Sequence, residues 1–180
     1  MTLEELEERV EALERRLAGS DEGGVRARSF ELVDDAGCVR AELSIREGVP
    51  ALRIFDAEGL CRALLGVYEG VPWLRLFDKD GLPRAGLRVF DELGAGLELF
   101  DEKGTTRATL HVLSEELGVS LNLYDERGVA RGGLAVLGKC AGLDLWDEAG
   151  VPRAGLRVFE EMGPRLELYD ENGNAIWSAR

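Results

Sequence analysis

The sequence contains few of the residues that enzymes most often use for chemistry. Among its 180 residues His111 is the single histidine, glutamine is absent, and the three cysteines form no Cys-x-x-Cys pair. No Gly-x-x-x-x-Gly-Lys or Gly-x-Gly-x-x-Gly loop stands where a phosphate would be held between a strand and a helix. A histidine-based triad or metal site therefore lacks support, although spacing alone leaves open a glycosidase-type pair among the carboxylates. We expect a protein that is not an enzyme, with no catalytic residue, no metal and no cofactor.

Long apolar runs and targeting signals are also missing. No stretch approaches the length that spans a membrane, and the acidic start MTLEELEERV lacks the basic and apolar parts of a signal peptide. Cys38, Cys61 and Cys140 are odd in number and occupy unrelated positions, which predicts free thiols in a reducing compartment. We expect a cytoplasmic protein without membrane insertion; leaderless export and a phage particle stay open.

Positive charge is scarce relative to negative charge. The 35 acidic residues outnumber the 22 basic ones, for a net charge of −13, and only Lys79, Lys103 and Lys139 are lysines. A surface this acidic repels phosphate backbones and anionic lipids, so we do not expect nucleic acid as a partner. The arginine-rich, glutamine-free composition suits a heat-adapted organism, and GC-rich codon usage would produce it equally well.

What the sequence does contain is one short pattern repeated seven times. Each copy reads Leu-x-Leu-aromatic-Asp-x-x-Gly-x-x-Arg-Ala-x-Leu-x-Val, as in residues 74–89. A period of 22 to 24 residues is typical of a repeat architecture. The aspartates that anchor the copies are Asp34, Asp56, Asp78, Asp101, Asp125, Asp147 and Asp170.

Each copy predicts a β-hairpin. Apolar residues alternate with polar or variable ones on both sides of Asp-x-x-Gly, the period of a strand with one apolar face. Asp suits the first turn position because its carboxylate accepts backbone N–H groups, and Gly suits the fourth because it tolerates positive φ. A calcium loop would need further oxygen ligands where Arg84 and an apolar strand stand, so we interpret the aspartates as turn formers.

The predicted fold class is therefore an all-β repeat of about seven hairpins. Three arrangements are compatible with the pattern: a meander, a solenoid-like coil, or a prism whose core is shared between subunits, which we favour because closed symmetry protects sheet edges. In the last copy Ile176, Trp177 and Ala179 replace Arg, Ala and Leu, as expected of a capping repeat. Insertions fall only in the second connection of each repeat, around Gly48, Gly70, Gly94, Gly118, Gly142 and Gly163.

A different element precedes the repeats. The heptad spacing of Leu3, Leu6, Val10, Leu13 and Leu17 predicts a short coiled-coil helix over residues 1–19 that serves oligomerisation as a dimer or trimer. The alternative is an amphipathic helix packed on its own β domain. Residues 20–29 are interpreted as a linker and lead-in strand, and residues 30–180 as the β-hairpin repeat domain.

A second periodic feature pairs an aromatic residue with an arginine. By strand parity both should point away from the leucine and valine side chains, unless a bulge at the turn resets the alternation, and they could stack through cation–π contacts. This ladder could seal the second face of the sheet, form an interface, or offer rings to a glycan or protein ligand. Its members are Phe55, Phe77, Phe100, Tyr124, Trp146 and Tyr169, with Arg40, Arg62, Arg84, Arg107, Arg131 and Arg153.

Two resemblances accompany these motifs. The runs LYDERG at 123–128 and LYDENG at 168–173 resemble the turns of YD repeats in bacterial toxin shells. The whole layout is similar to uncharacterised bacterial proteins with a short coiled coil followed by LxL(F/Y)DxxGxxRAxL hairpin repeats, a resemblance that implies a fold and no activity. The function expected is a structural or scaffolding protein that self-assembles as a symmetric homo-oligomer; the alternative is a binding module that uses the aromatic and arginine ladder.

Overall fold

The computed structural model describes residues 3–18, 27–91, 94–113 and 118–180. One helix, α1 (Leu3–Ala18), precedes fourteen β-strands. The strands are β1 (Ser29–Val33), β2 (Val39–Arg46), β3 (Val49–Phe55), β4 (Cys61–Tyr68), β5 (Val71–Phe77), β6 (Pro83–Phe90), β7 (Gly94–Phe100), β8 (Thr106–Val112), β9 (Val119–Tyr124), β10 (Ala130–Leu137), β11 (Cys140–Trp146), β12 (Pro152–Phe159), β13 (Gly163–Tyr169) and β14 (Ala175–Ala179).

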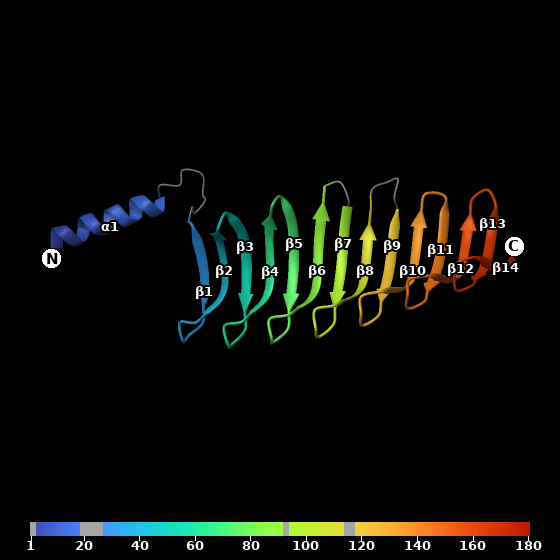
Figure 1. The fold of residues 1–180 in the computed structure, drawn as a ribbon. Helices are drawn as coiled ribbons and strands as arrows, with labels where there is room; N and C mark the ends of the chain where they lie inside the picture. The colour runs from blue at the N-terminus through green and yellow to red at the C-terminus, as the bar shows by residue number, and fades with distance from the viewer. Residues whose placement is uncertain (1–2, 19–26, 92–93, 114–117) are drawn as a thin grey trace.

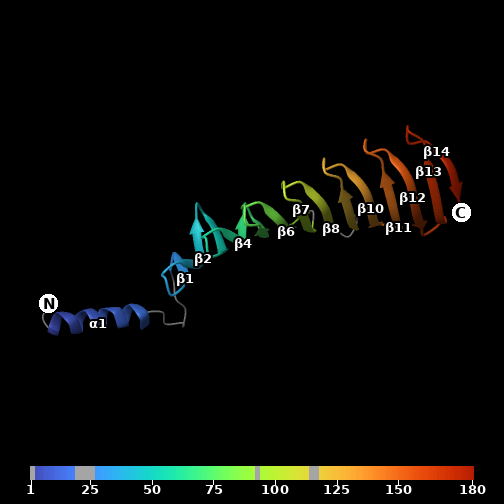
Figure 2. The same cartoon turned by 90° about the horizontal axis from the view of Figure 1, so that it is seen from below.

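The fourteen strands form one open sheet in sequence order. Every strand pairs antiparallel with its neighbours in the chain, from β1 at one edge to β14 at the other (Figure 1). The sheet is a single layer, and no described element covers either face of it (Figure 2). The hairpin repeats predicted from the sequence are confirmed as a meander; a solenoid would require parallel pairing between successive coils, which this ladder lacks.

The Asp-x-x-Gly turn has the same geometry in all seven repeats. In the turn after β9, the N–H of Gly128 donates to the carbonyl of Asp125, and the N–H of Asp125 donates to the carbonyl of Val129. Gly128 has φ +76°, in the left-handed region where a Cβ is disfavoured. The predicted roles of Asp and Gly in the turn are therefore confirmed.

A β-bulge follows each of these turns. Opposite Leu99 and Phe100 of β7 lie Ala108 and Thr106 of β8, so Arg107 is the extra, unpaired residue. The same register shift recurs in every Asp-x-x-Gly hairpin. In six repeats the extra residue is the arginine of the ladder, and in the last it is Ile176.

The connections of variable length join the strands at their other ends, away from the Asp-x-x-Gly turns. Between β2 and β3 the turn consists of Glu47 (φ 52°) and Gly48 (φ 81°), two positive values as in a type I′ hairpin turn. The prediction that Gly142 lies in such a connection is wrong. Gly142 sits within β11, paired with Ala135 and Arg157, and Gly138 (φ 56°) occupies the turn instead.

A single layer leaves the chain without an interior. No large side chain is fully buried among the described residues, and Ala51 is the only buried apolar side chain in the core. The accessible surface is 13,100 Å², against about 8,600 Å² for a compact monomer of this mass. Part of that excess belongs to the helix and the sheet edges, and the rest is a sheet face without a covering layer.

The predicted N-terminal helix is confirmed as a helix, with Glu4 and Glu5 in its first turn where the helix dipole favours acids. It lies beyond the β1 edge of the sheet, and among the described residues it contacts no strand (Figure 1). Leu6 and Val10 of the predicted seam are 44% and 45% exposed. The side chains of Leu3, Leu13 and Leu17 lie outside the described residues, and the pairing of this seam with another helix stays a prediction.

Candidate functional site

One face of the sheet carries a straight row of leucines. The register aligns one leucine at the centre of each strand from β2 to β13, each directly opposite the next. This leucine row crosses the strands and runs along the length of the sheet. It consists of Leu43, Leu52, Leu65, Leu74, Leu87, Leu97, Leu110, Leu121, Leu134, Leu143, Leu156 and Leu166.

Two apolar rows flank the leucine row. Toward the Asp-x-x-Gly turns, large and small residues alternate from strand to strand, as in the neighbours Leu99 of β7 and Ala108 of β8. Toward the other connections the alternation is reversed, as in Val89 of β6 and Ala95 of β7. The three rows together are the leucine face, and from β2 to β13 they contain no charged residue.

The leucine face is exposed to solvent along its whole length. Leu65 is 52% exposed, Leu134 54% and Leu156 50%, and every leucine of the row except Leu52 belongs to the exposed large hydrophobic residues. Soluble monomers rarely present a continuous apolar patch of more than a few hundred square ångströms. The leucine face exceeds this limit among the described residues, since its apolar side chains stay exposed across twelve strands.

The opposite face, in contrast, covers itself. Two of its aromatic rings lie over glycines of the preceding strand: a Cβ on Gly133 would come within 2.8 Å of the ring of Trp146, and one on Gly86 would lie 3.8 Å from Phe100. Tyr124 occupies the equivalent place beside Thr109, with 3.3 Å between the two hydroxyl oxygens. All six rings of the predicted ladder are half-buried, as expected for rings packed on neighbouring backbone.

The arginines of the ladder contact backbone and aspartate rather than rings. Arg131 donates from Nε to the carbonyl oxygen of Trp146 in the following repeat, at 3.1 Å, and its Nη1 lies 3.5 Å from Asp125 Oδ2. Arg62 makes the equivalent pair of contacts with Phe77 and Asp56. The predicted stacking of arginine on the rings is not what the structure has. The bulge explains this difference, because it directs the arginine side chain toward the turns instead of the rings. In four of the six repeats the arginine therefore ties one turn to the next repeat; these are Arg40, Arg62, Arg107 and Arg131.

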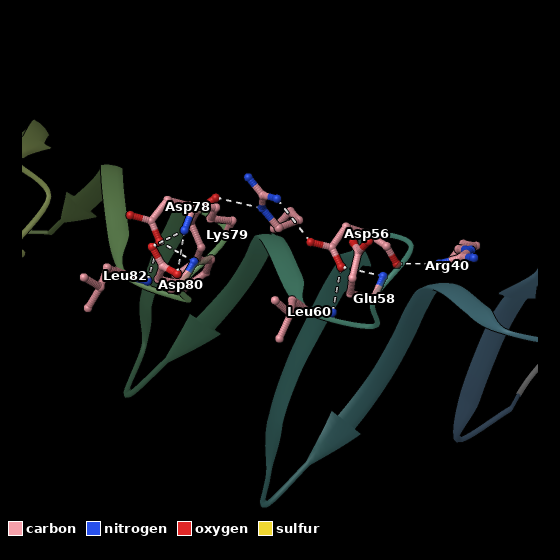
Figure 3. A network of polar contacts seen from close by, with 10 residues as sticks. Arg40, Asp56, Glu58, Leu60, Asp78, Lys79, Asp80 and Leu82 are labelled. Atoms are coloured by element: carbon pink, nitrogen blue, oxygen red, sulfur yellow. Dashed lines mark hydrogen bonds and ion pairs between the residues drawn. The ribbon is translucent and has the colours of Figure 1, made fainter.

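The aspartates are fully engaged in the turns. Oδ1 of Asp56 accepts the N–H groups of Glu58 and Leu60, and Oδ1 of Asp78 accepts those of Asp80 and Leu82 (Figure 3). Arg40 of the preceding repeat reaches the backbone carbonyl of Asp56. The remaining carboxylate oxygens face arginines of their own repeats.

These contacts lower the pKa of all seven turn aspartates. The backbone N–H of Val129 is the largest cause for Asp125, and that of Val151 for Asp147. Burial acts most strongly on Asp56, Asp78 and Asp101 and raises the pKa, but the hydrogen bonds and the arginine outweigh it. Carboxylates held in this way are structural anions. Within the described residues no cluster of three or more histidine, cysteine, aspartate or glutamate side chains is arranged to hold a metal ion.

One hollow on the opposite face is lined by several aromatic side chains. It has a volume of about 370 Å³ between β4, β5 and β6, and its aromatic walls are Tyr68, Trp73 and Phe90. The guanidinium of Arg75 lies 5.2 Å from the centre of the Trp73 ring, and that of Arg88 lies 5.4 Å from the centre of Phe90. The buried Nε1 of Trp73 has no hydrogen-bond partner. None of these residues belongs to the predicted ladder. Trp73 stands where other repeats carry Ala51, Gly96, Ser120, Gly142 and Arg165, and this departure is the signal that would have marked the hollow.

A polar cluster lies on the same face near the C-terminal end. Arg157 pairs with Asp144 and Glu167, and Tyr169 donates to Glu167 at 2.8 Å. Burial and this hydrogen bond raise the pKa of Tyr169, while the Tyr169 hydroxyl is the largest cause that lowers the pKa of Glu167. His111 lies apart from the cluster, over Gly96 of β7, where its ring fills the space of the absent side chain. Arg165 also pairs with Glu167, so the two arginines balance the two carboxylates, and the cluster holds β11, β12 and β13 together.

The geometry defines a single-layer antiparallel β-repeat protein with one apolar and one self-covered face. No protein-family model matches the chain, and no curated protein matches it. The resemblance to bacterial hairpin-repeat proteins therefore stays a prediction. Within the part of the chain that the structure describes, no helix combines the length and the apolar character needed to cross a membrane.

Proposed function

We propose that this chain is a structural or scaffolding protein, without enzymatic activity, that self-assembles as a symmetric homo-oligomer. The observation that carries the proposal is the uncovered leucine face, an apolar surface that extends over twelve strands. Hydrophobic burial is the dominant favourable contribution to folding, and here little of it is available within one chain. Association supplies the second layer that β domains require.

The predicted coiled coil contributes to the same assembly. A seam of two heptads is marginal in isolation, but a second contact between the same chains raises its effective concentration. Leu6 and Val10 are exposed in the single chain, as they must be if a partner helix is to cover them. The helix and the sheet then stabilise one assembly, a dimer or a trimer.

Light scattering coupled to size exclusion tests this proposal. The full chain should elute as an oligomer, and a variant lacking residues 1–20 should remain associated, with weaker affinity. A full chain that is a folded monomer at micromolar concentration would overturn the proposal. Circular dichroism of each sample distinguishes a folded monomer from an unfolded chain.

A second candidate function is that of a binding module, which the hollow at Trp73 favours. Aromatic side chains with adjacent arginine donors can hold the apolar face and the polar groups of a sugar ring. The predicted ladder supports this function less well, since its rings lie against neighbouring strands. Screening the oligomer on an array of neutral and acidic glycans tests the idea. Binding that is lost in Trp73→Ala and kept in Phe159→Ala, on the same face, would support it; an array without signal would remove it.

A further inference from the structure

We propose that the leucine face is covered by the same face of a second copy of this chain, with the two-fold axis along the leucine row. Each repeat then lies on the same repeat of its partner. This inference rests on the proposed self-assembly and adds to it the surface, the occupant and the order of the repeats.

The area of the face meets the requirement of a stable dimer. Twelve strands about 4.8 Å apart, each contributing about 20 Å of length, give roughly 1,200 Å² per copy. The two copies together bury about 2,400 Å², above the 1,600 Å² typical of specific complexes and within the range of obligate homodimers. A small ligand or a single peptide strand would leave most of this surface in water.

The chemistry of the face selects a partner like itself. Its three rows carry no charge from β2 to β13, whereas the chain as a whole carries −13. The acidic residues that the structure describes lie in the turns, on α1 and on the opposite face, so the described parts of two leucine faces can meet without burying a carboxylate. Two leucine faces packed on each other bury the apolar surface of both copies, and no apolar face is left for a third copy.

The shapes of the two flanking rows agree with this arrangement. A rotation about the leucine row brings each strand over the same strand of the partner, in the reverse direction. On β7 the large Leu99 then faces Ala95, and on β8 the small Ala108 faces Val112. The same match of large to small holds for most strands, and the bulkiest pair is Leu123 with Val119 on β9. Interdigitation of this kind is what packed sheets require.

The helix determines the direction of the axis. Face-to-face packing allows a two-fold axis along the row, which superposes equal repeats, or along the strands, which places β4 over β11. Only the first brings both copies of α1 to the same end, since α1 lies beyond the β1 edge (Figure 1). A parallel coiled coil and the sheet contact are then compatible in one dimer.

Cross-linking of single cysteines distinguishes the two axes. In a chain in which Cys38, Cys61 and Cys140 are replaced by serine, Leu65→Cys on β4 and Leu143→Cys on β11 are made separately and together. A short bis-maleimide is added to each oligomer, and products are resolved by denaturing electrophoresis. Leu64→Cys, the next residue of β4 and on the opposite face, is the matched control.

We expect each single variant to give a covalent dimer in high yield, and Leu64→Cys to give none. Cross-linking only in the double variant would place the axis along the strands and overturn the inference. An oligomer in which neither leucine-row variant reacts, or in which Leu64→Cys reacts instead, would overturn it as well. A chain that light scattering finds to be a folded monomer refutes the proposed function itself, so the two failures are separable.

Discussion

The two faces of this sheet share one backbone and one hydrogen-bond ladder, yet only one of them is covered. On the opposite face the six ladder rings are half-buried, and two of them, Trp146 and Phe100, lie over the glycines Gly133 and Gly86. On the leucine face the central row consists of side chains of equal height, and none can cover the next. In a single-layer sheet, a large side chain can therefore cover its neighbours where the adjacent residue is a glycine without a side chain.

The largest expected effect comes from placing charge on the leucine face. Leu110→Glu combined with Leu121→Glu puts two carboxylates side by side on β8 and β9, at the centre of the row. Burying an unpaired charge costs several kcal/mol, so we expect the oligomer to dissociate or the chain to lose its fold. Sedimentation velocity and circular dichroism measure the two outcomes. Ser120→Glu, adjacent on β9 but on the opposite face, should leave association intact; equal loss in both would contradict the difference between the faces.

A smaller effect separates two adjacent glycines of β10. A methyl group at position 133 would lie 2.8 Å from Trp146 and 2.9 Å from Asn122, whereas one at position 132 would meet Leu145 at 3.5 Å. Gly133→Ala should cost about 1–3 kcal/mol through overpacking. Gly132→Ala restores the alanine that five other repeats carry here and should add about 0.4–1 kcal/mol of stability.

Urea unfolding at fixed protein concentration measures both variants, since concentration affects the stability of an oligomer. The contrast between the two glycines is the quantity of interest. If Gly133→Ala proves as stable as Gly132→Ala, the rings of the opposite face are not packed against the glycines.

Low pH should reduce the free energy of unfolding through the turn aspartates. The loss for each single turn should be smaller than the effect of Gly133→Ala. The folded-state pKa of Asp125 is lowered from 3.8, so its stabilising contribution is complete above that value and is lost as the pH falls through the folded pKa. The other six turn aspartates act in the same direction. We expect the free energy of unfolding to decline below about pH 4, as followed by urea unfolding between pH 6 and pH 3. Asp125→Asn should reduce the slope of that decline, and the exposed Glu126→Gln should not change it.

The smallest effect is that of salt on association. Two copies of a chain with charge −13 repel one another, and this repulsion is screened beyond about 8 Å at physiological ionic strength. We expect the dissociation constant to fall several-fold when sodium chloride is raised from 20 to 300 mM. Analytical ultracentrifugation measures it. Weaker association in salt would indicate that ion pairs, rather than the leucine face, hold the copies together.

Much of the local structure could be predicted from the sequence. Strict alternation and Asp-x-x-Gly turns predict the hairpins, because the side-chain period of a strand and the positive φ of Gly128 are local properties. The position of Gly142 was mistaken because Gly138, four residues earlier, offers the same chemistry in a shorter connection. Where a repeat contains two glycines, the sequence pattern alone does not determine which of them occupies the turn.

The contacts between repeats were harder to predict. The bulge that directs Arg131 toward Asp125 and Trp146 depends on register, and register depends on pairing between strands. The hollow around Trp73 does not follow from the repeat pattern, because Trp73 itself has no aromatic equivalent in the other repeats. The open single layer is a property of the whole chain and follows from no single motif.

The regularity of the Asp-x-x-Gly turns has one further consequence. All seven turns share the same backbone hydrogen bonds, and all insertions lie in the other connections. Four ladder arginines also donate to a backbone carbonyl of the next repeat: Arg40, Arg62, Arg107 and Arg131. Duplicating or deleting one repeat would thus change the sheet by two strand spacings, about 10 Å, without disturbing the contacts of the remaining repeats. The number of repeats therefore sets the length of the sheet in fixed increments of two strands.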